Sequence, residues 1–135
     1  MDEYFTDDSD LDIKDVWEDF EYIWSKNIVD CELLRENNPQ SGDYFREDED
    51  AIKIRRHIWL NIQGISSDAY RRMNAGIITP DATLHAYAKH DEDIQDLDVI
   101  KFGVWKYRIQ GFNKSQYSGQ VAFQEFDMKR IDKEV

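Results

Sequence analysis

Hydrophobic residues recur every three or four positions between residues 11 and 24. The apolar positions are Ile13, Val16, Trp17, Phe20, Ile23 and Trp24, and the acidic positions between them are Asp12, Asp15, Glu18, Asp19 and Glu21. This period is that of an amphipathic helix, so we predict a helix over about residues 11–26 with Ser9 as its N-cap. The apolar stripe is expected to pack in the core or, alternatively, on a neighbouring subunit.

Strict alternation of apolar and polar positions replaces the helical period later in the chain. In residues 52–62 the apolar side is interrupted only by Arg56 and consists of Ile52, Ile54, Ile58, Leu60 and Ile62. A helical spacing also fits part of this segment, but its density of β-branched residues favours a strand. Residues 83–89 alternate in the same way, and a weaker alternation in residues 28–36 also indicates a strand.

The segment DVIKFGVWKYRIQG, residues 98–111, predicts a β-hairpin that turns at Gly103. One face of its second strand carries Trp105, Tyr107 and Ile109, which we expect to point inward. The other face carries Lys106 and Arg108, which we expect to point outward, where an acidic neighbour could meet them. A polar loop over residues 113–119 and a final strand over residues 120–131 complete the pattern.

Three segments show neither the helical period nor the alternation of a strand. We predict an acidic flexible arm over residues 1–10, a short helix or turn over residues 66–76, and a long exposed loop over residues 37–50 that docks through Tyr44 and Phe45. Many short strands with few helices predict a mainly β fold: a small β-barrel or sandwich over about residues 51–132, with an N-terminal amphipathic helix. Residues 11–135 are expected to form a single domain.

The net charge of −12 is concentrated in the first part of the chain. Residues 1–50 hold 18 Asp and Glu against 4 Lys and Arg, whereas residues 51–135 hold 11 against 13. Because nucleic acid carries a dense negative charge, specific DNA or RNA binding is not expected of this chain. The single cysteine, Cys31, excludes an intramolecular disulfide and favours a reducing compartment.

Motifs of catalytic and metal sites are missing from the sequence. It contains no nucleophile elbow, P-loop, dinucleotide fingerprint or H-E-x-x-H pattern. A calcium loop starting at Asp91 would need Gly and Glu where Asp96 and Phe102 stand. Cys31 lies between two acidic residues, which disfavours a nucleophilic thiolate. We therefore expect no enzyme activity, no metal and no cofactor.

A family resemblance lies in residues 76–132. This segment combines a strand of alternating small residues, a turn with Asp93, Ile94, Asp98 and Ile100, a glycine hairpin, the Y-R-I strand at Tyr107–Ile109, a polar loop and a closing strand. In these features it resembles the head closure and head-to-tail adaptor proteins of tailed bacteriophages, the neck or stopper family. The helix and the acidic arm before residue 50 are not part of the resemblance.

The resemblance implies a structural virion protein of the phage neck. Such a protein forms a homo-oligomeric ring between the portal or adaptor protein and the tail terminator or tail tube protein, and it closes or bridges the channel while DNA passes without specific binding. Its location would be the virion, after synthesis in the host cytoplasm. The start of the chain shows no secretory pattern and no window is long and apolar enough to span a membrane, so no membrane partner is expected.

The sequence offers two sets of candidate contact residues for such a ring. The candidate subunit-interface residues are Tyr44, Phe45, Trp59, Lys106 and Arg108. Acidic residues that either face the channel and repel DNA or dock on a basic surface of a neighbour are Asp2, Glu3, Asp7, Asp8, Asp12 and Asp15.

Two other classes of function stay open at this point. An acidic protein of this size can mimic DNA and inhibit a nucleic-acid enzyme of the host, although residues 51–135 are close to neutral. Exposed aromatic residues such as Trp59 and Trp105 would suit a carbohydrate- or peptide-binding sandwich.

Overall fold

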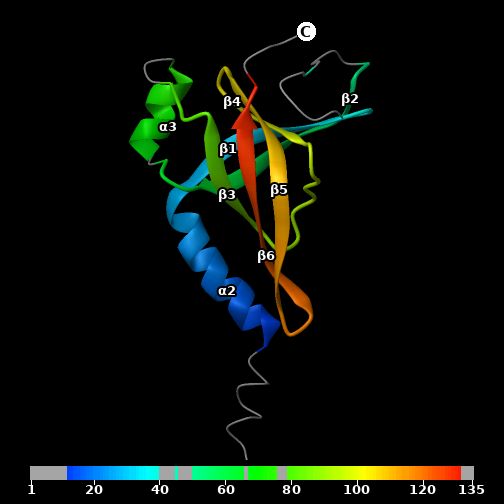
Figure 1. The fold of residues 1–135 in the computed structure, drawn as a ribbon. Coiled ribbons are helices and arrows are strands. Elements are labelled where there is room, and N and C mark those ends of the chain that lie inside the picture. The colour runs from blue at the N-terminus through cyan, green and yellow to red at the C-terminus, as the bar shows by residue number, and fades with distance from the viewer. Residues whose placement is uncertain (1–11, 40–44, 46–49, 66, 76–78, 132–135) are drawn as a thin grey trace, which may run out of the picture.

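The computed structural model describes residues 12–39, 45, 50–65, 67–75 and 79–131. In chain order these residues form helix α2 (Ile13–Trp24), the 3-10 helix η1 (Ser25–Asn27), strand β1 (Ile28–Glu36), strand β2 (Ile52–Ile62), helix α3 (Ser67–Asn74), strand β3 (Thr83–Lys89), strand β4 (Val99–Phe102), strand β5 (Trp105–Tyr117) and strand β6 (Gln120–Arg130). Figure 1 shows the strands wrapped around one another, with α2 alongside them.

The six strands form a closed antiparallel barrel in the order β1-β2-β3-β6-β5-β4. The mainly β prediction and the N-terminal helix are therefore confirmed. Since β1 pairs with both β2 and β4, the barrel begins at Ile28 and not near residue 51 as the sequence predicted. The predicted strands at residues 28–36, 52–62 and 83–89 and the short helix after residue 66 are all present.

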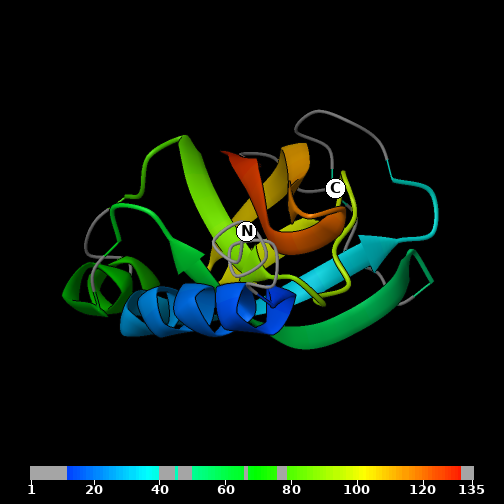
Figure 2. The same cartoon turned by 90° about the horizontal axis from the view of Figure 1, so that it is seen from below.

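Helix α2 packs on the outside of β3 and β6 through its apolar stripe, and Figure 2 shows the helix lying along one side of the strands. The indole nitrogen of Trp17 donates to the Val121 carbonyl at 2.9 Å, and that of Trp24 donates to the Tyr87 carbonyl at 3.0 Å. The ring of Phe20 stacks on Phe123 with centroids 5.0 Å apart. These contacts confirm that the stripe packs on the core of its own chain, apart from Ile23, which is 67% exposed.

The N-cap of α2 is Asp12, whose carboxylate accepts a hydrogen bond from the Lys14 amide at 3.2 Å. A carboxylate at this position also interacts favourably with the helix dipole. The predicted cap, Ser9, was wrong by one turn, and Ser9 itself lies outside the described residues.

The inward residues of every strand fill the barrel interior. The alternation in β2 and β3 places Ile58, Leu60, Ile62, Leu84, Ala86 and Ala88 in one buried cluster with Tyr107, Ile109, Phe126 and Met128. The β4–β5 hairpin turns at Gly103, whose φ of 61° is in the left-handed region that favours glycine. The inward positions of Tyr107 and Ile109 are confirmed.

The predicted loop at residues 113–119 is wrong. Strand β5 continues to Tyr117 and pairs with β6 up to a two-residue turn at Ser118 and Gly119, both with positive φ. The residues in this part of β5 are polar because most of them are exposed, so composition alone suggested a loop. Their main-chain groups are nevertheless paired along a hairpin that projects beside α2 (Figure 1).

The segment between β3 and β4 is tied to the barrel by two arginines. Arg35 of β1 holds Asp98 through two hydrogen bonds of 2.9 and 2.8 Å and also contacts Asp93 at 3.2 Å. Arg56 of β2 binds Glu92 at 3.1 Å and the Asp93 carbonyl. The sequence predicted a solvated turn here, with carboxylates available to a neighbour. Asp98 is instead buried and paired within its own chain.

Candidate interaction surface

Large apolar side chains are exposed at four positions of the described surface: Tyr22, Ile23, Trp59 and Val104. Two of these lie on α2, one lies on the outer side of β2, and Val104 lies in the turn between β4 and β5. Isolated apolar residues are common on protein surfaces, so the charges and main-chain groups around each one decide whether it indicates an interaction site.

The outer face of α2 is acidic. It carries Asp15, Glu18 and Asp19 together with Tyr22 and Ile23, all of them exposed. On its flank, Glu21 forms an ion pair of 3.8 Å with Lys89 of β3. This surface, which we call the helix face, therefore presents three carboxylates beside two apolar side chains.

The outer side of β2 is cationic at one end and aromatic at the other. Its outward residues are Lys53, Arg55, His57, Trp59 and Asn61. Arg55 contacts Glu32 at 3.1 Å and His57 contacts Asp30 at 2.8 Å, and both of these acidic partners belong to β1. Trp59 is 48% exposed and stands next to Asp30 in the β1–β2 register. We call this row of residues the β2 stripe.

Strand β2 pairs more extensively with one of its neighbours than with the other. It pairs with β1 from Ile52 to Asn61, whereas its pairing with β3 is limited to Asn61 and Ile62. Among the described residues, the β2–β3 pairing is thus confined to the last two residues of β2. Figure 2 shows β2 as the outermost strand on the side of the molecule that also carries α2.

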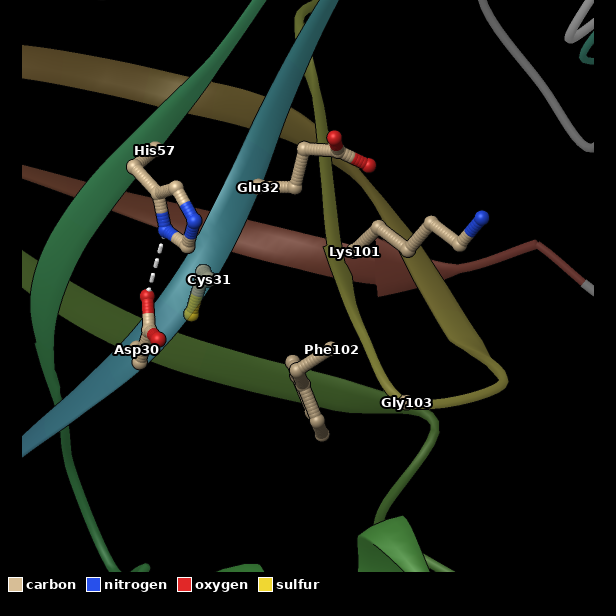
Figure 3. A pocket seen from close by; sticks show the side chains of 7 residues that line it. All are labelled: Asp30, Cys31, Glu32, His57, Lys101, Phe102 and Gly103. Atoms are coloured by element: carbon tan, nitrogen blue, oxygen red, sulfur yellow. Dashed lines mark hydrogen bonds and ion pairs between the residues drawn. The ribbon is translucent and has the colours of Figure 1, made fainter.

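A shallow depression of about 250 Å³ lies on the neighbouring surface, where β4 separates from β1 (Figure 3). It is lined by Asp30, Cys31, Glu32, His57, Lys101, Phe102 and Gly103. Its histidine and its two carboxylates are engaged in the ion pairs described above. Burial of Cys31, together with the charge of Asp30, raises the pKa of the thiol far above its usual value, so the thiol is a poor nucleophile.

The structure corrects three of the predicted subunit-interface residues. Phe45 is 1% exposed and packs with Leu34, Val99 and Ile131 in a second cluster outside the barrel. Lys106 and Arg108 point away from the barrel interior, but they are buried beneath Phe45 and its neighbours. Alternation predicted which way these two side chains point, but it could not show that the chain covers them.

Arg108 has partners within its own chain. Its Nη1 atom donates to Glu36 at 2.8 Å and to the Leu97 carbonyl at 2.9 Å. The expectation that Lys106 and Arg108 lie exposed to a neighbour is therefore wrong.

The structure describes some of the remaining predicted contact residues but not others. Trp59 is exposed as expected, Asp15 is exposed in the first turn of α2, and Asp12 serves as the helix cap. Tyr44, Asp2, Glu3, Asp7 and Asp8 lie outside the described residues. Trp105, considered as a sugar platform, donates to the Met73 carbonyl at 2.8 Å and packs against the core.

His85 of β3 contacts two carboxylates of β6. Its Nδ1 lies 2.8 Å from Asp127 and its Nε2 lies 3.0 Å from Glu125. Because these two ring nitrogens point in different directions, the three side chains do not converge on one point. Within the described ranges, no group of three or more His, Cys, Asp or Glu side chains is arranged to hold a metal ion.

Helices α2 and α3 are also too short and too polar to cross a bilayer, and the same holds for every helix in the described ranges.

The chain matches no model of a protein family, and no curated protein is detectably similar to it in sequence.

Proposed function

We propose that this chain is a structural protein of the neck of a tailed bacteriophage. In this proposal it is a subunit of a homo-oligomeric ring that lies between the portal or adaptor protein and the tail, where it closes or bridges the DNA channel. The observation that carries the proposal is the agreement between fold and resemblance. Residues 76–132 supply β3, β4, β5 and β6 of a small barrel, which is the fold that the resemblance implies for them.

The surface of the molecule suits assembly into a ring. A ring of identical subunits needs two different faces on each subunit, one for each neighbour. The helix face and the β2 stripe are candidate contact surfaces for such a ring, because they differ in charge and both expose apolar side chains. DNA passing through such a ring would be repelled by any carboxylates that face the channel.

Electron microscopy of the purified chain tests the proposal. Rings with a central opening are the expected result at concentrations high enough for assembly. Addition of the purified chain to a nuclease or restriction-enzyme assay tests the alternative, in which the acidic residues mimic DNA and inhibit the enzyme. Stoichiometric inhibition of the enzyme by a chain that forms no rings would contradict the neck function.

A further inference from the structure

The four tryptophans of the chain differ in how the fold engages them. Trp17, Trp24 and Trp105 each donate the indole N–H to a main-chain carbonyl. The side chain of Trp59, in contrast, makes no hydrogen bond and no ring contact within the described part of the chain, and the residue is 48% exposed. A large aromatic side chain with a free polar tip is well suited to contact a ligand.

Trp59 belongs to a group of four outward residues on β1 and β2. It lies directly opposite Asp30 in the strand register, and His57 lies directly opposite Glu32. Opposite residues of an antiparallel pair share one face with their Cβ atoms about 4.5–5.5 Å apart, and the next residue on that face follows about 7 Å along the strand. These four side chains therefore form one compact patch, which we call the Trp59 group.

The polar members of the Trp59 group keep unused hydrogen-bonding atoms. Asp30 contacts His57 through Oδ1, and Glu32 contacts Arg55 through Oε1. In the described ranges, the second carboxylate oxygen of each acid and Nε2 of the histidine have no partner. The side chains of Asp30 and His57 are 44% and 79% exposed. The two ion pairs thus orient the patch and leave these atoms open to a ligand.

The shallow depression of Figure 3 adjoins the Trp59 group on its β4 side. It shares Asp30, Glu32 and His57 with the group and adds Lys101 and Gly103. Its volume of about 250 Å³ is below the range of about 300–1,000 Å³ in which pockets enclose a drug-sized molecule. A depression of this kind suits one unit of a longer ligand that lies on the surface.

The chemistry of this surface favours a neutral ligand rich in hydroxyl groups. The negative charges of Asp30 and Glu32 are matched in number by the positive charges of Arg55 and Lys101, so a net charge on the ligand brings no advantage. A hydroxyl group donates to a carboxylate oxygen and also accepts from an N–H group. The C–H face of a sugar ring is apolar and can stack on an indole such as that of Trp59. A saccharide combines these two properties.

We propose that the Trp59 group and the adjoining depression bind a neutral saccharide. One sugar ring stacks on Trp59, and its hydroxyl groups form hydrogen bonds with Asp30, Glu32 and His57. This inference goes beyond the proposed ring and does not depend on it. Because Trp59 and His57 also belong to the β2 stripe, a saccharide and a neighbouring subunit would compete for this surface wherever the stripe forms a ring contact.

The indole N–H signals in a proton–nitrogen NMR spectrum test the site directly. The four tryptophans give four such signals, and Trp59→Phe identifies the signal of Trp59 by its loss. Maltotriose, cellotriose and triacetylchitotriose are added separately at millimolar concentration, with the protein below the concentration at which it assembles. We expect at least one of them to shift the Trp59 signal until it saturates, whereas the signals of Trp24 and Trp105 stay in place.

Substitutions separate stacking from hydrogen bonding, with the affinity measured from the main-chain amide signals of β1. Trp59→Ala should weaken binding about tenfold or more, and Trp59→Phe should weaken it less because an aromatic face remains. Asp30→Asn should weaken binding about two- to tenfold. The matched controls are Tyr22→Ala and Asp15→Asn, which remove an exposed aromatic ring and an exposed carboxylate from the helix face and should leave the affinity unchanged.

Three results would overturn the inference. The first is a Trp59 signal that none of the three saccharides moves, and the second is an affinity that Trp59→Ala leaves unchanged. The third is a Trp59 signal that moves with an uncharged peptide but with no saccharide, which would assign the surface to peptide binding. Rings in the electron microscope without saccharide binding would overturn this inference alone, whereas a chain that binds saccharide but never assembles would contradict only the proposed ring.

Discussion

Breaking the buried ion pair between Arg35 and Asp98 should strongly destabilise the barrel. The side chains are 8% and 3% exposed, and the guanidinium holds the carboxylate through two hydrogen bonds of 2.9 and 2.8 Å. These hydrogen bonds raise the pKa of Arg35 above its already high value, which keeps it charged in the folded state. Replacing Arg35 by Met keeps most of the apolar stem but leaves Asp98 buried without its counter-charge.

We expect Arg35→Met to lower the free energy of unfolding by about 3–5 kcal/mol, the usual cost of removing one partner of a buried pair. Asp98→Asn should cost less, because Arg35 keeps its contact with Asp93. The double variant should be more stable than the sum of the single effects predicts, by about 0.5–3 kcal/mol, since neither charge is then left alone.

Urea unfolding followed by tryptophan fluorescence measures these changes, provided that the slope of the free energy against urea stays constant. Arg55→Met is the matched control. Its pair with Glu32 is 41% and 35% exposed, so the change should cost no more than about 1 kcal/mol. A loss below about 1 kcal/mol for Arg35→Met, or additive single effects, would refute the reasoning.

Three further predictions concern other parts of the fold. The hydrogen bond from Arg35 lowers the pKa of Asp93, so this carboxylate contributes stability above its unfolded pKa of about 3.9 and loses that contribution as the pH falls through the lower folded value. The free energy of unfolding, measured at a series of acidic pH values, should therefore depend less on pH for Asp93→Asn than for the wild type. Identical slopes of this free energy against pH would contradict the prediction. The variant with both Lys106→Glu and Arg108→Glu should unfold at a lower urea concentration than the wild type. Its free energy of unfolding should fall by several kcal/mol, because Arg108 and Glu36 are buried together. A fully stable variant would show that these side chains are accessible after all. Cys31 should resist a thiol reagent at pH 8 in the folded protein and react in urea, and rapid labelling of the native chain would mean that the thiol is not buried as the structure has it.

The fold was largely predictable because its signals are local. The period of 3.6 in residues 13–24 and the period of 2 in β2 and β3 each reflect one face packed on a core, and Gly103 marks the hairpin. The strand at residues 113–117 was missed because exposed polar residues look the same in a loop and in a two-stranded ribbon. Main-chain pairing, which distinguishes the two, leaves no trace in the composition.

The contacts of the candidate surface were less predictable because they join distant residues. Arg35 and Asp98 are 63 positions apart, and neither spacing nor composition connects them. Phe45 lies in a segment rich in turn residues and charges, so the sequence suggested exposure, whereas the residue covers Lys106 and Arg108. The short pairing between β2 and β3 likewise depends on where β3 leaves β2, which is a property of the barrel as a whole.

The central claim is that this chain assembles with copies of itself into a closed ring. Native mass spectrometry of the full-length protein over a range of concentrations tests it most directly. The account predicts one dominant species whose mass is a fixed multiple of the 16.1 kDa chain, and which dissociates as salt screens the charged contacts. A chain that stays monomeric at every concentration would contradict it.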